Sequence, residues 1–235
     1  MGGDHGNTGE SRELRSFGRR HGRTLSDRQN HLWNTLLPDV ALDIAKSAPV
    51  SLAPLFSAPT SETWLEIGFG GGEHLVWQAT HNPGVGLIGC EPFKDGVVKV
   101  LDAIERQKLG NIRLHADDAR DILRWLPKAS ISNAFVLFPD PWPKKKHQKR
   151  RLVNSTLLGM LVRVLKPRGQ LRLGTDIADY ARTMLMAAMA EPRLTWQAQT
   201  ADAWRVRPDD WPKTRYEAKA EREGRSSCYL LFERV

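Results

Sequence analysis

Two stretches of this chain place carboxylates among residues that shape loops. Glu66 stands before three glycines at alternate positions, Gly68, Gly70 and Gly72, and Asp140 stands between prolines. Closely spaced glycines let the backbone approach a ligand because they carry no Cβ atom. A carboxylate two residues before such a turn is placed to meet a cationic part of the ligand. The first stretch therefore predicts a small-molecule site, although a plain tight turn is the alternative.

The second stretch, residues 138–151, reads Phe-Pro-Asp-Pro-Trp-Pro-Lys-Lys-Lys-His-Gln-Lys-Arg-Arg. Its alternate prolines exclude both a helix and a strand ladder, so we expect a stiff loop. Asp140 and Trp142 share this loop with six basic residues, which are Lys144, Lys145, Lys146, Lys149, Arg150 and Arg151. The loop supplies six positive charges and one negative one, against a net charge of +8 for the chain. This local excess favours binding of a polyanion such as nucleic acid, with a solvated basic loop as the alternative. Trp142 either stacks on a base or packs in the core.

The glycine pattern does not fit a dinucleotide fingerprint. In G-x-G-x-x-G, the third glycine would fall at Glu73 or at Leu75. Glu66 followed by the glycines suits the amino-acid part of S-adenosylmethionine, which carries an ammonium and a sulfonium, better than a pyrophosphate.

Two further acids follow predicted strands. Glu91 is placed to accept hydrogen bonds from ribose hydroxyls. Asp118 is placed to receive an adenine amino group, with Asp117 as its rival and a helix N-cap as the alternative for either. In sequence order, the three acids Glu66, Glu91 and Asp118 are a stronger signal than any one alone.

Apolar runs and helical stripes alternate along the chain, which predicts an α/β fold with a parallel sheet and helices on both faces. Ligands in such sheets bind at the carboxyl ends of the strands, where the acids above and Asp176 stand. The expected strands are residues 64–67, 85–90, 112–115, 134–138, 170–173, 194–199 and 228–233. The expected helices are residues 73–78, 95–109, 119–126, 152–165 and 177–189.

The 235 residues fit one sizeable domain, residues 26–235, after a flexible basic arm at residues 1–25. Ser26 and Gln29 resemble a capping box, and the prolines at 49, 54 and 59 indicate a linker. Residues 200–227 show no convincing element and are interpreted as a substrate-facing insert. The two cysteines form no metal-binding or disulfide pattern, and neither a signal segment nor a long apolar run is present. We expect a cytoplasmic protein.

At these motifs the chain resembles the bacterial tRNA (guanine-N7)-methyltransferases, the TrmB family. The matching stretches are residues 19–23, 65–70, 138–151, 174–176, 214–217 and 231–234. The proline-flanked aspartate with its basic tail is the specific one, because many methyltransferases share the glycine turn. Glu91 is followed by Pro92-Phe93, where many members carry valine and a polar residue.

The resemblance implies a class I S-adenosylmethionine-dependent methyltransferase, Rossmann-like, with a seven-stranded, mostly parallel sheet containing one antiparallel strand. It implies methyl transfer to N7 of guanine 46 in the variable loop of tRNA. The implied cofactor-binding residues are Glu66, Gly68, Gly70, Glu91, Asp118 and Asp140, of which Asp140 is also catalytic. The implied substrate-binding residues are Lys144, Asp176, Thr214, Arg215, Tyr216 and Glu217.

Two other functions compete with this one. A nicotinamide-dependent oxidoreductase is disfavoured by the missing third glycine and by the basic loop. A non-catalytic RNA-binding protein is disfavoured by the acids at every matching strand end. We expect tRNA as the partner, no metal and no membrane, and a monomer or weak homodimer.

Overall fold

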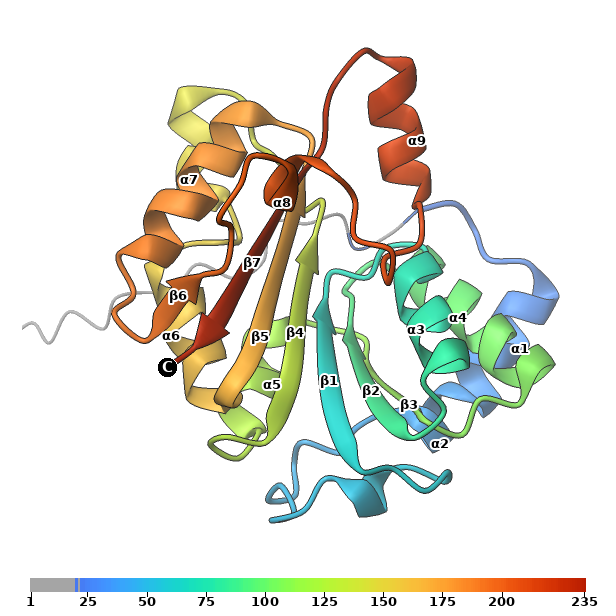
Figure 1. Cartoon of the computed structure of the whole chain (residues 1–235). Coiled ribbons are helices and arrows are strands. Elements are labelled where there is room, and N and C mark those ends of the chain that lie inside the picture. The colour runs from blue at the N-terminus through green and yellow to red at the C-terminus, as the bar shows by residue number, and fades with distance from the viewer. Residues whose placement is uncertain (1–19, 21) are drawn as a thin grey trace, which may run out of the picture.

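A seven-stranded sheet forms the centre of the molecule (Figure 1). The computed structural model describes residues 20 and 22–235. The strand order is β3-β2-β1-β4-β5-β7-β6, and only β7 runs antiparallel to its neighbours. The strands are β1 (Glu62–Ile67), β2 (Val85–Cys90), β3 (Ile112–His115), β4 (Ile131–Leu137), β5 (Leu165–Thr175), β6 (Leu194–Trp196) and β7 (Cys228–Arg234). This order confirms the mostly parallel sheet with one antiparallel strand.

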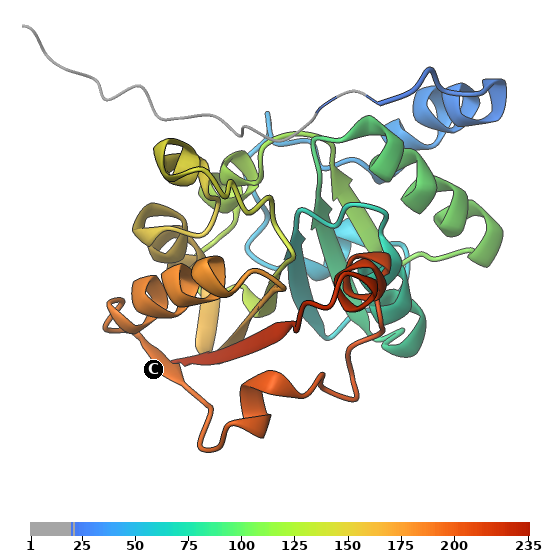
Figure 2. The ribbon, with the colours of Figure 1, turned by 90° about the horizontal axis from the view of Figure 1, so that it is seen from above.

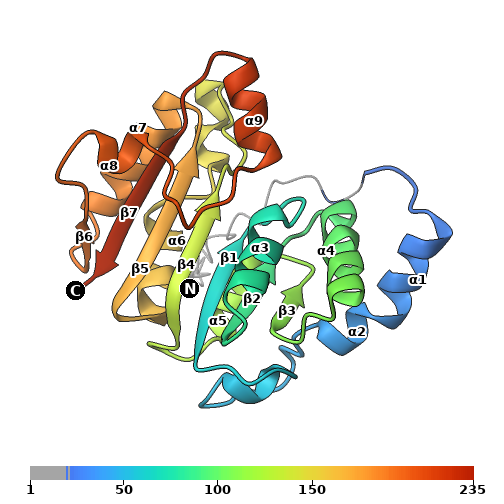
Figure 3. The same cartoon turned by 45° about the vertical axis from the view of Figure 1, so that its right-hand side comes forward.

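Helices cover both faces of the sheet, as right-handed crossovers on either side of β1 require. One face packs against α1 (Asp27–Thr35), α2 (Leu37–Val40), α3 (Glu73–His81) and α4 (Lys94–Gln107). The other packs against α5 (Ala119–Trp125), α6 (Ser155–Val164) and α7 (Ala178–Met189) (Figure 3). Because the connections change face between β1 and β4, the carboxyl ends of these two strands border a crevice.

The chain between β6 and β7 crosses one face of β4, β5 and β7, the face turned toward the viewer in Figure 1. Trp211 from this segment packs on Phe135, Leu137 and Tyr229. The segment contains α8 (Asp202–Arg205) and α9 (Arg215–Arg222), so the prediction that residues 200–227 hold no element was wrong. From above, α9 lies over α3 (Figure 2). Both α8 and α9 are short and polar, which is why hydrophobic periodicity did not reveal these two helices.

The chain before β1 also departs from the prediction in part. Ser26 and Gln29 form the expected capping box at the start of α1. The proline-rich stretch is not a simple linker, because its 3-10 helix η1 (Ala53–Leu55) is flanked by Leu52 and Phe56, which are both buried in the core. Prolines end regular structure but do not keep their neighbours from packing. The predicted arm at residues 1–25 lies mostly outside the described residues.

No helix within the described part of the chain is long and apolar enough to cross a bilayer.

Candidate active site

Five acidic side chains lie at the carboxyl edge of the sheet, one for each of the five consecutive parallel strands. Glu66 belongs to the end of β1, Glu91 follows β2, Asp118 follows β3, Asp140 follows β4 and Asp176 follows β5. The parallel topology therefore places the predicted acids along one edge.

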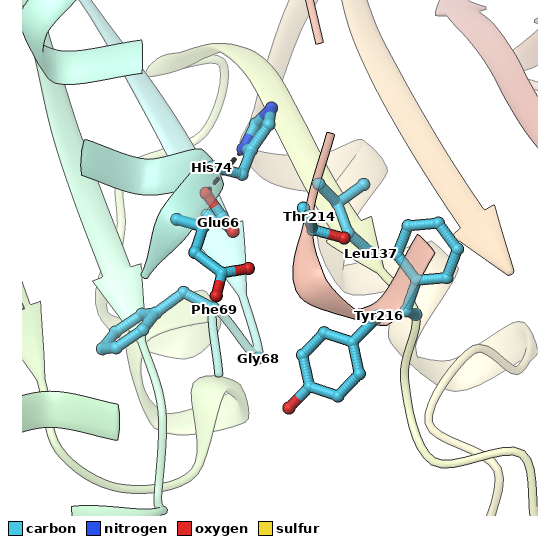
Figure 4. A pocket seen from close by; sticks show the side chains of 9 residues that line it. Glu66, Gly68, Phe69, His74, Leu137, Thr214 and Tyr216 are labelled. Carbon is cyan, nitrogen blue, oxygen red and sulfur yellow. Dashed lines mark hydrogen bonds and ion pairs between the residues drawn. The ribbon is translucent and has the colours of Figure 1, made fainter. Parts of the chain in front are cut away.

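Glu66 is buried at the crevice between β1 and β4. Its Oε2 atom accepts a hydrogen bond from Nδ1 of His74, over 2.8 Å. Among the described residues, His74 is the only recorded partner of this carboxylate. Glu66 also lines a pocket with Gly68, Leu137 and Tyr216, and Figure 4 shows it facing this pocket. One carboxylate oxygen is thus held by the protein and the other remains for a ligand.

The glycine turn after β1 has the conformation that its composition predicts. Gly68, Gly70 and Gly72 have φ angles of 73°, 54° and 76°, in the region that side chains disfavour. A Cβ atom on Gly72 would lie 2.1 Å from Val100, whereas one on Gly68 would meet nothing within 4 Å. The turn is therefore packed tightly beneath and open beside Gly68.

Glu91 holds the same turn from the neighbouring strand. Its Oε2 accepts a hydrogen bond from the Gly70 amide (2.7 Å), and its Oε1 accepts one from the Phe93 amide (2.9 Å). Burial raises the pKa of Glu91; the two hydrogen bonds oppose this, and the charges of Asp140 and Glu66 add to the rise. These acids are therefore close enough to influence one another.

Asp118 is the N-cap of α5, and its carboxylate accepts hydrogen bonds from the amide and side chain of Arg120. Asp117 instead accepts from the Asp118 amide (2.8 Å) and from Arg20 (2.6 Å). The N-cap alternative is therefore present at Asp118. A role toward adenine remains a prediction, and it requires a face of the carboxylate that Arg120 leaves accessible.

Asp140 differs from the other acids because it accepts no recorded hydrogen bond and forms no ion pair within residues 20 and 22–235. Although the residue is exposed, burial by the surrounding protein raises its pKa. The loop on either side of it is strained: Phe138 and Trp142 have φ angles of 49° and 43°. Trp142 is half-buried and contacts His147 and Arg150 of its own loop, outside the hydrophobic core clusters.

The basic loop contains a 3-10 helix, η2 (Lys145–Arg150), with exposed lysines. Arg151 does not belong to this charged surface, contrary to the prediction, because its side chain is only 3% exposed. Its guanidinium donates to Thr183 (2.7 Å) and to the Pro141 carbonyl (3.0 Å), and it forms an ion pair with Asp179. Arg151 thus fastens the loop to α7.

Residues 214–217 form the start of a helix, although no element was predicted within residues 200–227. Thr214 caps α9, and Glu217, 1% exposed, completes a capping box while accepting a hydrogen bond from the Tyr229 hydroxyl. Thr214 and Tyr216 line the pocket opposite Glu66 (Figure 4), and the Arg215 amide donates to Glu73 of α3 over 2.9 Å. The start of α9 therefore closes one side of the pocket, with Glu217 facing the interior.

Asp176, the remaining predicted substrate contact, forms a 2.7 Å ion pair with Arg225, just beyond α9. This pair joins the edge of β5 to the end of the insert.

Several residues that the sequence reasoning did not single out support this site: His74, Gln78, Trp211 and Tyr229. His74 and Gln78 are four residues apart on α3 and share one buried face. Polar residues at core positions of an amphipathic helix were the available signal.

Comparison with known proteins defines the class first. The structure of TrmN from Thermus thermophilus matches with a TM-score of 0.53 and 16% identity, over 78% of this chain and 47% of that one. A geranyl diphosphate methyltransferase in complex with sinefungin matches with a TM-score of 0.50 and 13% identity, over 82% of this chain and 75% of that one. A family model described as "Putative methyltransferase" matches residues 60–230. The fold is that of a class I S-adenosylmethionine-dependent methyltransferase.

Sequence relatives make the assignment narrower. The tRNA (guanine-N(7)-)-methyltransferases of Chelativorans sp. (strain BNC1) and Rhizobium meliloti (strain 1021) are 48% and 46% identical to this chain. Each alignment covers 93% of this chain and 94% of the relative. The chain belongs to the tRNA (guanine-N7)-methyltransferase family, which confirms the resemblance found in its motifs.

The residues at the glycine turn fit S-adenosylmethionine, the cofactor of this class. The space beside Gly68 admits a ligand against the backbone, and the free oxygen of Glu66 is an acceptor for an ammonium group. A dinucleotide-binding turn requires a third glycine, and Glu73 or Leu75 stands at that position in this chain.

Proposed function

We propose that this chain transfers the methyl group of S-adenosylmethionine to N7 of guanine 46 in the variable loop of tRNA. Family membership supports the reaction and the substrate class. The observation that carries the residue assignment is Asp140, an acid without a recorded protein partner among the described residues, lying between the cofactor acids and the basic loop.

Each of three acids binds a different part of the cofactor. Glu66, with one oxygen held by His74, binds the ammonium of the amino-acid part through the other. Glu91 shapes the turn at Gly70 and binds the ribose hydroxyls with its remaining acceptor capacity, and Asp118 faces the adenine. Gly68 lets the ligand lie against the backbone, and Gly70, whose missing Cβ would stand 3.1 Å from the Tyr216 hydroxyl, binds the ligand beneath that ring.

Catalysis needs alignment more than proton transfer. S-adenosylmethionine supplies a methyl carbon on a sulfonium, and N7 of guanine already carries an unprotonated lone pair. Asp140 accepts hydrogen bonds from the N1 and N2 hydrogens of the base, which fixes its edge, and its negative charge stabilises the positive charge that grows on the purine. This role requires ionised Asp140.

The substrate lies on the side of the crevice formed by the basic loop and α9. Lys144 and the exposed lysines of η2 contact phosphates, as sequence-independent RNA binding requires. Asp176, Thr214, Arg215 and Tyr216 contact the nucleotide from the insert. Glu217 contributes by holding the start of α9 in place rather than by touching RNA.

A labelled-methyl assay on unmodified tRNA tests this function. Wild-type protein is expected to modify guanine 46, and a transcript with adenosine at this position is expected to accept no methyl group. Asp140→Asn is expected to abolish turnover while tRNA binding persists, with Asp39→Asn, an exposed acid of α2, as the matched control. Methylation at another base would contradict the position, and normal turnover by Asp140→Asn would remove Asp140 from catalysis.

Two finer expectations accompany this function. Because the substrate is tRNA, we place the protein in the cytoplasm, and we expect a monomer or weak homodimer. Sedimentation at micromolar concentration would contradict the latter by showing a stable dimer or a larger assembly.

A further inference from the structure

His74 is a buried polar side chain for which the reaction itself supplies no role. It is 2% exposed and lies with its ring centroid 4.7 Å from that of Phe135 and 5.8 Å from that of Trp211. Burying an imidazole among aromatic rings is unfavourable unless its nitrogens are hydrogen-bonded. Both of its ring nitrogens have partners in this structure.

The neighbours of His74 determine which ring nitrogen carries the hydrogen. The Gln78 amide nitrogen lies 2.8 Å from the Asp210 carbonyl, and the Gln78 amide oxygen accepts from Asn82 over 2.9 Å. These two contacts fix the orientation of the Gln78 amide, because the reverse orientation would face two oxygens toward each other. The second hydrogen of the Gln78 amide nitrogen then points at Nε2 of His74, 3.1 Å away.

Nε2 of His74 is therefore an acceptor, and the hydrogen stands on Nδ1. Nδ1 donates it to Oε2 of Glu66 over 2.8 Å. A carboxylate on a side chain with several rotatable bonds would otherwise be free to turn. With one oxygen bound by a rigid ring, its second oxygen has a defined direction toward the pocket (Figure 4).

We propose that His74 is a positioning residue for cofactor binding: held by Gln78 and by the Asp210–Trp211 segment, it fixes the orientation of the Glu66 carboxylate. The proposal rests on the proposed function, in which Glu66 receives the ammonium of S-adenosylmethionine. It also gives the insert before α9 a role inside the cofactor site, through the Asp210 carbonyl and the Trp211 ring.

The test compares four variants. His74→Leu removes the donor, His74→Asn keeps an amide nitrogen close to where Nδ1 stands, and Glu66→Gln removes the charge that the ligand meets. The control is His81→Leu, at an exposed histidine of the same helix whose ring stacks on Trp77. Calorimetry with S-adenosylhomocysteine gives the Kd, and initial rates with saturating tRNA give KM for S-adenosylmethionine and kcat.

We expect His74→Leu to raise both Kd and KM by about 10–100-fold, the range for loss of one hydrogen bond to a charged group. kcat at saturating cofactor is expected to stay close to wild type. His74→Asn is expected to recover most of the affinity, and His81→Leu to change none of these quantities. A merely structural role would reduce the folded fraction, and with it kcat, without raising the Kd of the molecules that remain folded.

The outcomes separate this proposal from the function on which it rests. If Glu66→Gln binds the cofactor normally, the assignment of Glu66 fails. If Glu66→Gln weakens binding and a folded His74→Leu does not, or if His74→Asn behaves like His74→Leu, the positioning role of His74 is refuted.

Nitrogen-15 NMR of the wild-type imidazole provides a measurement that needs no folded leucine variant. The resonance is assigned by its absence in His74→Asn. Hydrogen on Nδ1 with a bare Nε2 is the expected pattern, and hydrogen on Nε2 would overturn the proposal.

Discussion

Glu217 provides the sharpest distinction between contact with substrate and support of the fold. Its carboxylate accepts hydrogen bonds from the Thr214 amide (2.8 Å), the Thr214 hydroxyl (3.0 Å) and the Tyr229 hydroxyl (2.7 Å). Glu217→Ala would leave these donors without their acceptor in a buried place and would open the capping box of α9. We therefore expect loss of stability first, with loss of function as its consequence.

The size of this effect follows from the contacts. Each buried donor left without an acceptor lowers the free energy of unfolding by about 1–3 kcal/mol, and breaking a buried charged network lowers it by about 3–5 kcal/mol in total. For a chain of this length, such a change lowers Tm by roughly 6–20 °C if unfolding stays cooperative. If α9 opens separately, the same cost appears as faster amide hydrogen exchange over residues 214–222. Thermal unfolding and hydrogen exchange together cover both cases.

Tyr229→Phe and Glu221→Ala calibrate the measurement. Tyr229→Phe removes one of the three donors and is expected to cost about 1–2 kcal/mol. Glu221, exposed on the same helix and paired with Lys213, is expected to cost about 0.5 kcal/mol or less when changed to alanine. Because α9 contributes Tyr216 to the pocket, Glu217→Ala should weaken binding of the cofactor as well as binding of tRNA. If Tm and hydrogen exchange stay unchanged and only the KM for tRNA rises, the structural role of Glu217 is refuted and a direct contact of Glu217 with tRNA is favoured.

Three further predictions concern the loop after β4. Lys145→Ala with Lys149→Ala should weaken tRNA binding and make its logarithmic salt dependence shallower by about 2, and an unchanged slope would argue against phosphate contacts. Arg151→Ala should lower Tm but leave that slope alone, because its guanidinium is buried against the protein; a shallower slope would contradict this. Burial raises the pKa of Asp140, so folding favours its neutral form, and the associated stability is lost as pH rises through the raised pKa. The Tm of Asp140→Asn should therefore exceed that of wild type by more at neutral pH than below pH about 4, where the carboxyl of Asp140 is neutral in both states. The reverse trend in calorimetry would show that ionised Asp140 does not destabilise the fold.

The sequence predicted the sheet well because its signals are local. Apolar runs at residues 64–67, 85–90 and 134–138 predicted strands whose carboxyl ends lie beside Glu66, Glu91 and Asp140, and parallel topology then placed these acids on one edge of the sheet. The boundaries of β5 were less predictable. A helix was predicted to residue 165 and a strand only from residue 170, because Lys166-Pro167 is typical of a helix end, yet the strand begins at Leu165 and continues through both residues. The helix had already ended at Val164, so the proline marks the change of element rather than a loop.

The insert was the hardest part to predict, because its structure depends on partners far away in the sequence. Thr214 and Glu217 form a T-x-x-E pattern, which is typical of a helix start, but the polarity of this stretch indicates an exposed segment rather than a buried one. The burial of Glu217 depends on the hydroxyl of Tyr229 on β7, and that of Trp211 depends on Phe135 on β4. No local pattern contains these contacts.

The charged residues of this site fall into two groups. Arg151 and Glu217 are charged, lie within motifs that match the family, and are nearly fully buried with partners supplied by α7 and β7. Their charges are satisfied inside the fold, so little interaction is left to offer a ligand. Asp140 has the opposite character: a raised pKa, a strained loop on both sides, and no recorded partner within the described residues. An unpaired, partly desolvated carboxylate is unfavourable for folding, and its free energy is recovered only when a ligand supplies donors or positive charge. A purine that donates two hydrogen bonds and becomes cationic supplies both, which makes Asp140 the acid best suited to the reacting base.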